Sequence, residues 1–533
     1  MHKCLVAVLF AAGAAANTIW PKPQQQSSGA QGLLTIDDAA FDFVATGATS
    51  SILSSAFKRY RGVLGLEQFA RGGSVAAHAE SKTITSCAVN VLSDEMELSL
   101  ETDEHYNLTV SAPTITITAA SVFAAIRGLE SLAQLVDHGL AVNATAVVDF
   151  PRYAYRGFMI DTSRHYYPVA TILMHLDAMA YSKFNVLHWH LVDSVSFPFE
   201  SVTFPEMSQT GAYSPSHVYT PQDVARIVTY AAERGIRVIP EFDTPGHVEK
   251  GYAALSPAVL TQCYDSKGAP SGTGPLNPTL NATYDFLTSF FSEIKQVFPD
   301  KFVHVGGDEV PADCWASNPE IKAWIAAHPT VSSFGDLEQY YELELLKILN
   351  AQGTSYICWQ EIFDNGVKIL PDTVVEVWKG GGGAWQADMS RVSAAGFHSV
   401  LSAPFYLNYI SYGEDWPKYY TVEPSNFTGG EEAEKKHLVG GTEVCMWSEF
   451  VDASNFISRS WPRAAAVGER GWSAKTVRDV DEARVRIAEF RCKLIARGLP
   501  AEPITNGGST SELGGHNYCP HEWEAAYRTP WNS

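Results

Sequence analysis

The stretch GFMIDTSRHYYPVATILMHLDAMAYSKFNVLHWHLVD, residues 157–193, decides the fold class. It opens with an apolar run that ends in Asp161, and it closes with a second apolar run that ends in Asp193. Between them Ile172 and Leu176 lie at helical spacing. Because strands that are buried on both faces are apolar throughout, the stretch predicts a strand, a crossover helix and a second, parallel strand.

The same pattern repeats along the rest of the chain. Six further apolar runs follow, at 237–243, 302–309, 355–361, 373–380, 398–405 and 438–450. Segments of helical character separate most of them, and eight such units predict an α/β fold of the (β/α)8 TIM-barrel type. The crossovers after the sixth run are the least helical, so a doubly wound open sheet remains the alternative.

A smaller unit precedes the barrel. Apolar alternation predicts strands at its centre and a helix near its end, which together indicate a small α+β domain without a cluster of ionisable residues. We expect it to have a structural role. The Pro-, Gln- and Ser-rich residues 17–32 are predicted to be an extended lead-in. The expected division is a signal peptide at 1–16, the α+β domain at 17–150, and the barrel with a C-terminal helix and tail at 151–533.

The amino-acid composition argues against some classes of binding partner. The 533 residues include 38 Lys and Arg against 59 Asp and Glu, which gives a net charge of −21. This balance argues against nucleic-acid partners and anionic membrane surfaces, which need clustered cations. No apolar run is long enough to span a bilayer, so we expect no membrane span. The 12% aromatic content is a mild indication of a sugar-binding surface.

The first residues predict export. Lys3, the apolar run 5–12 and the small residues 14–16 match a secretory signal, which places the protein in the lumen of the secretory pathway, a lysosome or vacuole, or outside the cell. Without the signal, seven cysteines remain, so at least one is unpaired within the chain. Glycosylation sequons begin at Asn107, Asn143, Asn281 and Asn426.

Carboxylates and large aromatic side chains end the predicted strands. In a (β/α)8 barrel the carboxyl ends of the strands form the active site, and acids beside aromatic rings are typical of carbohydrate pockets. The residues at these ends are Asp161, Asp193, Glu241, Asp243, Asp308, Glu309, Trp359, Trp378, Tyr406, Trp447 and Glu449.

The pair Asp308-Glu309 is the sharpest element of this set. Glycosidic cleavage needs a carboxylic acid to protonate the leaving oxygen and a group to stabilise the positive charge that develops on the sugar. Neighbouring strand residues point to opposite faces, so both acids reach one pocket only if the strand bends. Gly306 and Gly307 precede them and can supply that bend.

Other catalytic classes fit less well. His188 and His190 lie on one face of a strand, and these two rings and His247 are compatible with metal ligation. No HExxH motif is present, however, and histidines in the middle of a strand usually pack in the core. The sequence contains no GxSxG motif, which argues against a serine hydrolase. We therefore expect no metal and no cofactor.

Together the motifs resemble one family. RGFMIDTSRHYYP, KFNVLHWHLVDS, RVIPEFDTPGH, FVHVGGDEV, SYICWQE, VEVWKGG and WPRAAAVGERGWS resemble the family 20 β-N-acetylhexosaminidases of the eukaryotic type, over nearly the whole mature chain. The resemblance implies a retaining exo-hydrolase of terminal β-linked GlcNAc or GalNAc, in which the substrate's 2-acetamido group is the nucleophile. It also implies a dimer, and N-acetylhexosamine-terminated glycans as partners.

The resemblance also assigns roles to single residues. Glu309 would be the general acid and base, Asp308 would orient the acetamido group, and Tyr406 would donate a hydrogen bond to it. The implied sugar-binding residues are Arg156, Asp193, His247, Trp359, Trp378, Asn408, Trp447 and Glu449. The implied disulfides are Cys263–Cys314 and Cys492–Cys519, which leaves Cys87, Cys358 and Cys445 unpaired.

The chain departs from the family pattern at three places. Ser194 replaces an Asp, Ser448 replaces a Gly, and Asn408-Tyr409 lacks the Arg of relatives that act on sulfated sugars, which favours neutral substrates. Two alternatives stay open: a chitinase-like glycosidase with a protein nucleophile, and an inactive barrel that binds sugars. The paired acids argue against the second, because a binding protein needs no proton donor.

Overall fold

The computed structural model describes residues 18–66, 82–137, 139–255, 257–380, 383–411, 413–504 and 519. The predicted signal peptide lies outside these residues. None of the helices in the described part is both long and apolar enough to cross a bilayer.

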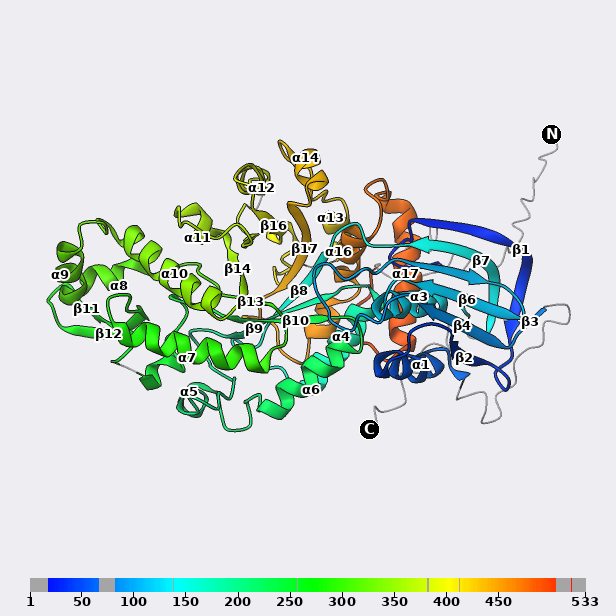
Figure 1. Cartoon of the computed structure of the whole chain (residues 1–533), viewed down its shortest axis with the longest axis horizontal. Helices are drawn as coiled ribbons and strands as arrows, with labels where there is room; N and C mark the ends of the chain where they lie inside the picture. Colours follow the sequence, from blue (N-terminus) through cyan, green and yellow to red (C-terminus); the bar gives the residue numbers. More distant parts are fainter. Residues whose placement is uncertain are drawn as a thin grey trace, which may run out of the picture.

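The N-terminal part is a seven-stranded mixed sheet in the order β2-β4-β6-β5-β7-β1-β3. Buried and less buried residues alternate in β4, β5 and β6, as expected for strands with one face on a core. Figure 1 shows the sheet in blue and cyan at one end of the molecule. Its elements are β1 (Gln25–Ile36), β2 (Asp42–Ala45), α1 (Ser51–Val63), β3 (Lys82–Ile84), β4 (Ser86–Val91), β5 (Tyr106–Val110), β6 (Thr114–Ala119), α3 (Val122–Leu135) and β7 (Ala141–Asp149).

The segment 17–32, predicted to be an extended lead-in, in part forms a strand of the N-terminal sheet. Residues from Gln25 onward form β1, which pairs antiparallel with β7 and parallel with β3. The composition of this segment is poor in strand-forming residues, so the pairing with two neighbouring strands determines its conformation rather than its own propensity.

The second part is a closed barrel of eight parallel strands in the order β10-β13-β14-β15-β16-β17-β8-β9. The last strand, β17, pairs with the first, β8, which confirms the barrel and excludes the open sheet. All eight predicted strands are present: β8 (Tyr155–Asp161), β9 (Val186–Val192), β10 (Arg237–Phe242), β13 (Phe302–His304), β14 (Ser355–Trp359), β15 (Val374–Val377), β16 (His398–Leu401) and β17 (Val439–Met446).

Helices surround the barrel, and the crossovers between β14 and β17 use short ones, in line with their weak helical pattern. The helices are α4 (Val169–Tyr181), α5 (Glu206–Gly211), α6 (Pro221–Ala232), η1 (Tyr252–Leu255), α7 (Asn281–Val297), α8 (Ala312–Ser317), α9 (Pro319–Ala327), α10 (Phe334–Ala351), α11 (Gln360–Asp364), α12 (Trp385–Ala394), η2 (Ala403–Phe405), α13 (Trp416–Tyr420), α14 (Gly430–Lys435), α15 (Phe456–Ser460), α16 (Arg463–Trp472) and α17 (Val480–Ala496).

Helix α17 lies between the barrel and the N-terminal sheet (Figure 1). Lys493 at its end donates to the carbonyl of Gln134, and Arg497 just beyond it pairs with Glu130 of α3 at 2.7 Å. Every residue of α3 is buried, because the helix has the sheet on one side and the barrel part on the other. The two parts therefore share an extensive packed contact.

The described residues contain two disulfides, and both are the implied pairs. Cys263–Cys314 joins the hairpin of β11 (Leu260–Tyr264) and β12 (Pro270–Leu276) to α8, and Cys492–Cys519 joins α17 to the tail. The three free cysteines of the described residues, Cys87, Cys358 and Cys445, are all buried.

Candidate active site

A backbone bend places the acid pair at the carboxyl end of β13. Gly306 and Gly307 have φ of 70° and 91°, and Glu309 has φ of 49°, so the chain leaves the extended conformation directly after the strand. Asp308 is buried, whereas the Glu309 side chain is 62% exposed. The predicted bend is therefore present, and it separates a buried acid from one that faces solvent.

Asp243, at the end of β10, fixes this bend. The backbone N–H of Gly307 donates to Asp243 Oδ1 at 2.9 Å, and a Cβ on Gly306 would lie 1.8 Å from the same oxygen. Burial and the neighbouring charge of Asp308 raise the pKa of Asp243 well above its ordinary value. Asp243 thus sits beside Asp308 as a neutral, buried partner.

His247 connects the pair to a third acid. Its Nε2 atom lies 3.7 Å from Glu309 Oε2 and 3.8 Å from Asp308 Oδ2, while Nδ1 lies 3.2 Å from Asp193 Oδ1. Burial opposes the charge on this ring, but the hydrogen bond to Asp193 and the neighbouring acids raise the pKa of His247 to about 10. The imidazolium therefore faces Glu309 throughout the neutral and mildly acidic range.

Aromatic rings form the wall next to these acids. Trp359 lies 6.3 Å from Trp378 and 6.0 Å from Trp447 between ring centroids, and Trp378 stacks with Tyr406 at 6.4 Å. Tyr406 and Trp359 are almost fully buried, whereas Trp378 and Trp447 keep part of their surface exposed. The four predicted aromatic residues thus meet in one cluster at the carboxyl rim.

Carboxylates hold two of the indoles in place. Trp359 Nε1 donates to Glu241 Oε1 at 2.8 Å, and Trp378 Nε1 donates to Glu361 Oε2 at 2.7 Å. Glu361 was not among the predicted site residues, although its position in WQE, two residues after Trp359, is a signal that could have identified it.

The placement of Arg156 in the sugar pocket is wrong. Arg156 lies near the amino end of β8, fully buried, and its Nη2 atom contacts Glu104 Oε2 at 2.5 Å. Its other donors are taken by the carbonyls of Lys183 and Tyr153. Arg156 therefore connects the barrel floor to the N-terminal part.

Arg164, and not Arg156, lies at the carboxyl rim of the barrel beside the other predicted site residues. It follows the carboxyl end of β8, with Nη2 2.8 Å from Asp193 Oδ2 and Nη1 3.2 Å from Asp161 Oδ2. Its guanidinium lies over the Trp447 ring, 4.9 Å from the centroid. The signal was present in the sequence, because Arg164 comes three residues after the acid that ends the first strand.

Comparisons with known proteins agree with this geometry. The profile of the glycosyl hydrolase family 20 catalytic domain matches residues 153–475, and that of a beta-acetyl hexosaminidase like domain matches residues 19–135. The chain belongs to glycosyl hydrolase family 20. It is an α/β-barrel glycosidase of the β-N-acetylhexosaminidase type, with the small domain that precedes such barrels.

Individual relatives cover most of the chain. Beta-hexosaminidase subunit beta of Homo sapiens is 47% identical over 89% of this chain and 84% of its own. Beta-hexosaminidase subunit alpha of Bos taurus is 44% identical over 98% of each chain. Among solved structures, the chitobiase of Flavobacterium johnsoniae superposes with a TM-score of 0.77 at 27% identity, covering 95% of this chain and 81% of that one.

Two departures from the family 20 pattern lie close to Arg164. Ser448 is buried, and its Oγ accepts from the backbone N–H of His165 at 3.1 Å, while its own N–H donates to Asp161. Ser194 donates its N–H to Asp193 Oδ1 at 2.5 Å. Both serines thus take part in holding the segments that carry the site.

The two remaining predicted residues lie on rim loops. Glu449 follows Trp447 and is exposed, and its charge contributes to the raised pKa of Arg164. Asn408 is half-buried, with no hydrogen-bond partner for its Oδ1 within the described part of the chain.

Within the described part of the chain, three groups of side chains bring ligand-type atoms within 4.8 Å of one another: His188, His304 and Glu376; Asp243, His247 and Asp308; Glu376, Glu443 and Cys445. Ring nitrogens of His188 and His247 already contact carboxylates. We assign no metal to these groups, and the absence of a metal stays a prediction.

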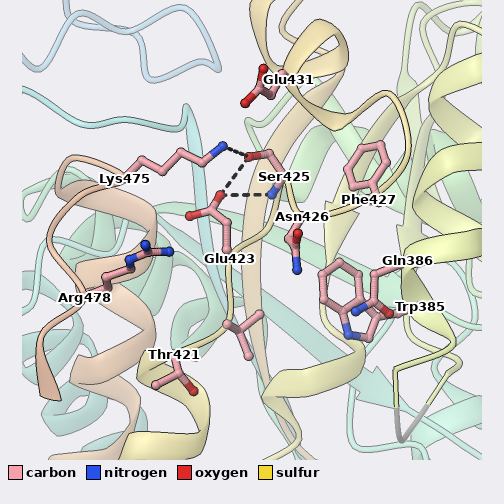
Figure 2. A pocket seen from close by; sticks show the side chains of 11 residues that line it. Trp385, Gln386, Thr421, Glu423, Ser425, Asn426, Phe427, Glu431, Lys475 and Arg478 are labelled. Carbon is pink, nitrogen blue, oxygen red and sulfur yellow. Dashed lines mark hydrogen bonds between the residues drawn. The ribbon is translucent and has the colours of Figure 1, made fainter.

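A cavity of about 650 Å³ lies elsewhere, on the barrel flank between α12, the 421–427 loop and the segment after α16. Figure 2 shows Trp385 and Phe427 on one side of it, with Lys475 and Arg478 on the other. Neither the acid pair nor the aromatic cluster lines it. We therefore place the chemistry of this family 20 enzyme at the barrel rim and not in this cavity.

Proposed function

We propose that this chain is an exo-acting β-N-acetylhexosaminidase that uses the acetamido group of its substrate as the nucleophile. The observation that carries the proposal is the acid pair: Asp308 and Glu309 lie within 3.8 Å of one imidazolium nitrogen, next to the aromatic cluster. In retaining enzymes with a protein nucleophile, two carboxylates instead lie on opposite sides of the scissile bond.

The roles follow from the surroundings of each group. Glu309 is exposed and can reach the glycosidic oxygen, so it donates the proton and later accepts one from water. Asp308 is buried and can hold the N–H of the acetamido group, which becomes positively charged as its carbonyl oxygen attacks the anomeric carbon. Tyr406, whose pKa burial raises well above its ordinary value, stays a hydrogen-bond donor toward that oxygen.

The remaining site residues bind the sugar ring. Trp359, Trp378 and Trp447 pack on its faces, and Arg164 with Glu449 is positioned for its hydroxyls. Asn408 extends the pocket at the rim, and Asp193 and His247 hold Glu309 from behind.

A mechanism-based inhibitor tests the proposal. The protein should hydrolyse 4-nitrophenyl β-GlcNAc and β-GalNAc, and a thiazoline that mimics the cyclic oxazolinium should inhibit it at a concentration well below KM. Weak thiazoline inhibition with active hydrolysis would point to the chitinase-like alternative. Tight thiazoline binding without hydrolysis by the parent protein would point to an inactive sugar-binding barrel.

We also propose that the protein works in the secretory pathway or a compartment reached through it, as a homodimer acting on glycans that end in N-acetylhexosamine. The four sequon asparagines are exposed, and the two disulfides suit an oxidising lumen. Glycosidase digestion with a gel-mobility shift tests the route, and light scattering of the purified protein tests the dimer.

A further inference from the structure

A cluster of buried, charged side chains lies in the barrel interior beneath the acid pair. His188 and His190 of β9 are two residues apart and therefore point to the same face, and Glu241 of β10 is in register with His190. Glu241 Oε2 lies 2.7 Å from His188 Nε2 and 2.7 Å from His190 Nδ1. All three side chains are essentially inaccessible to solvent.

Glu241 reaches the active site in two directions. Through His190, whose Nε2 lies 2.9 Å from Asp193 Oδ2, it contacts the Asp193–His247 arm that ends 3.7 Å from Glu309. Through its other oxygen it accepts the indole N–H of Trp359. One carboxylate therefore contacts both the support of the general acid and the wall of the sugar pocket.

The chain of contacts continues away from the site. His188 Nδ1 lies 2.6 Å from Glu443 Oε1, and the hydroxyl of Tyr155 donates to Glu443 Oε2 at 2.5 Å. Acids and imidazoles thus alternate from Glu309 down to the amino end of β8. Such an arrangement fixes each ring, because both nitrogens of His188 and of His190 face carboxylates.

We propose that Glu241 is a positioning residue, whose carboxylate fixes His190 and Trp359 and thereby holds Glu309 and the sugar wall in one arrangement. This role rests on the proposed function. Removal of this acid would leave His188 with Glu443 alone and His190 with Asp193 alone, which is costly because both rings are buried cations.

The electrostatic surroundings of Glu241 support this role. Burial opposes its ionisation, but His190, His304 and His188 hold the pKa of Glu241 well below its ordinary value. Against the cost of burial, Glu241 and Asp193 raise the pKa of His190 to about 10. The titratable and polar groups that face this cluster from the packed strands are His188, His190, Asp193, Asp243, His304, Trp359, Glu376, Glu443, Cys445 and Tyr155.

Glu376 provides a matched control in the same barrel core. It is fully buried, and burial together with Glu443 raises its pKa well above the ordinary value, so it is neutral. Exchange of a neutral carboxyl for an amide removes no charge. Glu376→Gln and Glu241→Gln therefore make the same chemical change at equal burial, and only the second removes an anion and a contact to the site.

The test compares kcat, KM and the pH profile of kcat/KM for the parent, Glu241→Gln and Glu376→Gln. In Glu241→Gln we expect kcat to fall at least tenfold. The alkaline limb should move to lower pH, because uncompensated imidazolium charge favours the ionised, inactive form of the general acid. Glu376→Gln should keep the parent profile. An unmoved profile and unchanged kcat in Glu241→Gln, or the same shift in both variants, would overturn the role.

A measurement on the parent covers the case in which Glu241→Gln does not fold. In protein labelled with ¹⁵N-histidine, long-range ¹H–¹⁵N spectra at pH 8.5 should show doubly protonated rings, since an ordinary histidine is neutral at that pH. Spectra in which no ring other than that of His247 is doubly protonated would refute the role of Glu241, because the acids around His247 account for one imidazolium without Glu241. Failure of the parent to hydrolyse either aryl glycoside would refute the proposed function itself, which separates the two outcomes.

Discussion

Nη2 of Arg164 lies 2.8 Å from Oδ2 of Asp193, at the carboxyl rim of the barrel. Asp193 also contacts His190 and His247, so under the proposed function this arginine supports the general acid and also borders the sugar pocket. Arg156, at the other end of the same strand, pairs with Glu104 in a fully buried position. Two arginines eight residues apart therefore have separate roles, one in the site and one in the fold.

Substitution of each arginine should separate these roles. Arg164→Gln should lower kcat/KM about 10²-fold, roughly the loss of a charge-assisted hydrogen-bonding pair. It should cost less stability than Arg156→Gln, because Arg164 is partly exposed and Asp193 keeps its contacts with His190 and His247. Arg156→Gln should instead reduce the free energy of unfolding by about 3 kcal/mol, because it removes one of two partners from the buried Glu104 carboxylate. Steady-state kinetics and urea unfolding of both variants measure this. A normal KM in Arg164→Gln would contradict its assignment to the sugar pocket.

Substitution of Glu309 and of Asp308 should change kcat in ways that depend differently on the leaving group. Glu309→Gln removes proton donation, so its kcat should fall about 10²–10⁴-fold for an unactivated glycoside and much less for an aryl glycoside with an acidic leaving group. Asp308→Asn should lower kcat by a similar factor for every leaving group, because it acts on the acetamido group. Rates measured across a series of substituted phenyl glycosides report this difference. Equal slopes in the two variants would exclude the division of roles.

The bend before the acid pair should be indispensable for activity. Gly306→Ala meets Asp243 Oδ1 at 1.8 Å and must also adopt a φ of +70°, so it should displace Asp243 and the acids that follow. Gly366 has a similar φ of +78° with no atom within 4 Å of a Cβ, which makes Gly366→Ala the control for backbone strain alone. Gly366→Ala should lose about 1 kcal/mol of stability from the left-handed φ alone, and Gly306→Ala should lose more because of its contact with Asp243. Only Gly306→Ala should lose kcat, by at least 10²-fold. Equal kcat in both would show that the bend tolerates a side chain.

Much of this architecture follows from pattern alone. The eight barrel strands could be predicted because parallel strands buried on both faces leave continuous apolar runs, and the acids and tryptophans at their ends could be predicted because active sites of barrels lie there. The bend at Gly306 and Gly307 followed from the need to bring adjacent side chains to one pocket.

What the sequence did not provide was tertiary information. Arg156 and Arg164 flank the same strand, and only the buried Glu104, contributed by the N-terminal part, shows that Arg156 belongs to the floor. Strand β1 was missed because its pairing partners are distant in the sequence: one is β3, and the other is β7, more than a hundred residues away. The contacts of Glu241 likewise depend on the register between β9 and β10, which no local pattern encodes.

One carboxyl group, that of Glu502, should contribute more to the stability of the protein as the pH falls. Burial, with a contribution from Asp415, raises the pKa of Glu502 to about 7 against the opposing charge of Arg463. A raised carboxyl pKa favours folding when the group is protonated, so this contribution is complete below about pH 4.5 and is lost as the pH rises through 7. Glu502→Gln should therefore raise Tm at pH 8, on the order of 2 °C, and leave Tm unchanged at pH 4.5.

Glu482 gives the control of opposite sign. Its burial is outweighed by Arg486 and Lys22, which lower its pKa, so its contribution is present above its ordinary pKa and is lost as the pH falls. Glu482→Gln should lower Tm at pH 8, where Glu502→Gln raises it. Differential scanning calorimetry at both pH values measures the two variants, and a Tm change of the same sign in both would contradict the assignment.

The rim loop after β16 should determine the response to substrate charge. The Tyr409 side chain is 62% exposed and stacks on Tyr406 at 5.7 Å between centroids, so it lies beside the sugar pocket without a positive charge. We expect the parent to prefer plain over 6-sulfated GlcNAc aryl glycosides. Tyr409→Arg should raise the ratio of sulfated to plain kcat/KM about tenfold, the effect of one favourable charge pair at a partly exposed site. Tyr409→Gln, which removes the ring without adding charge, should leave the ratio unchanged. A parent that hydrolyses both substrates equally well would show that another cation serves this purpose.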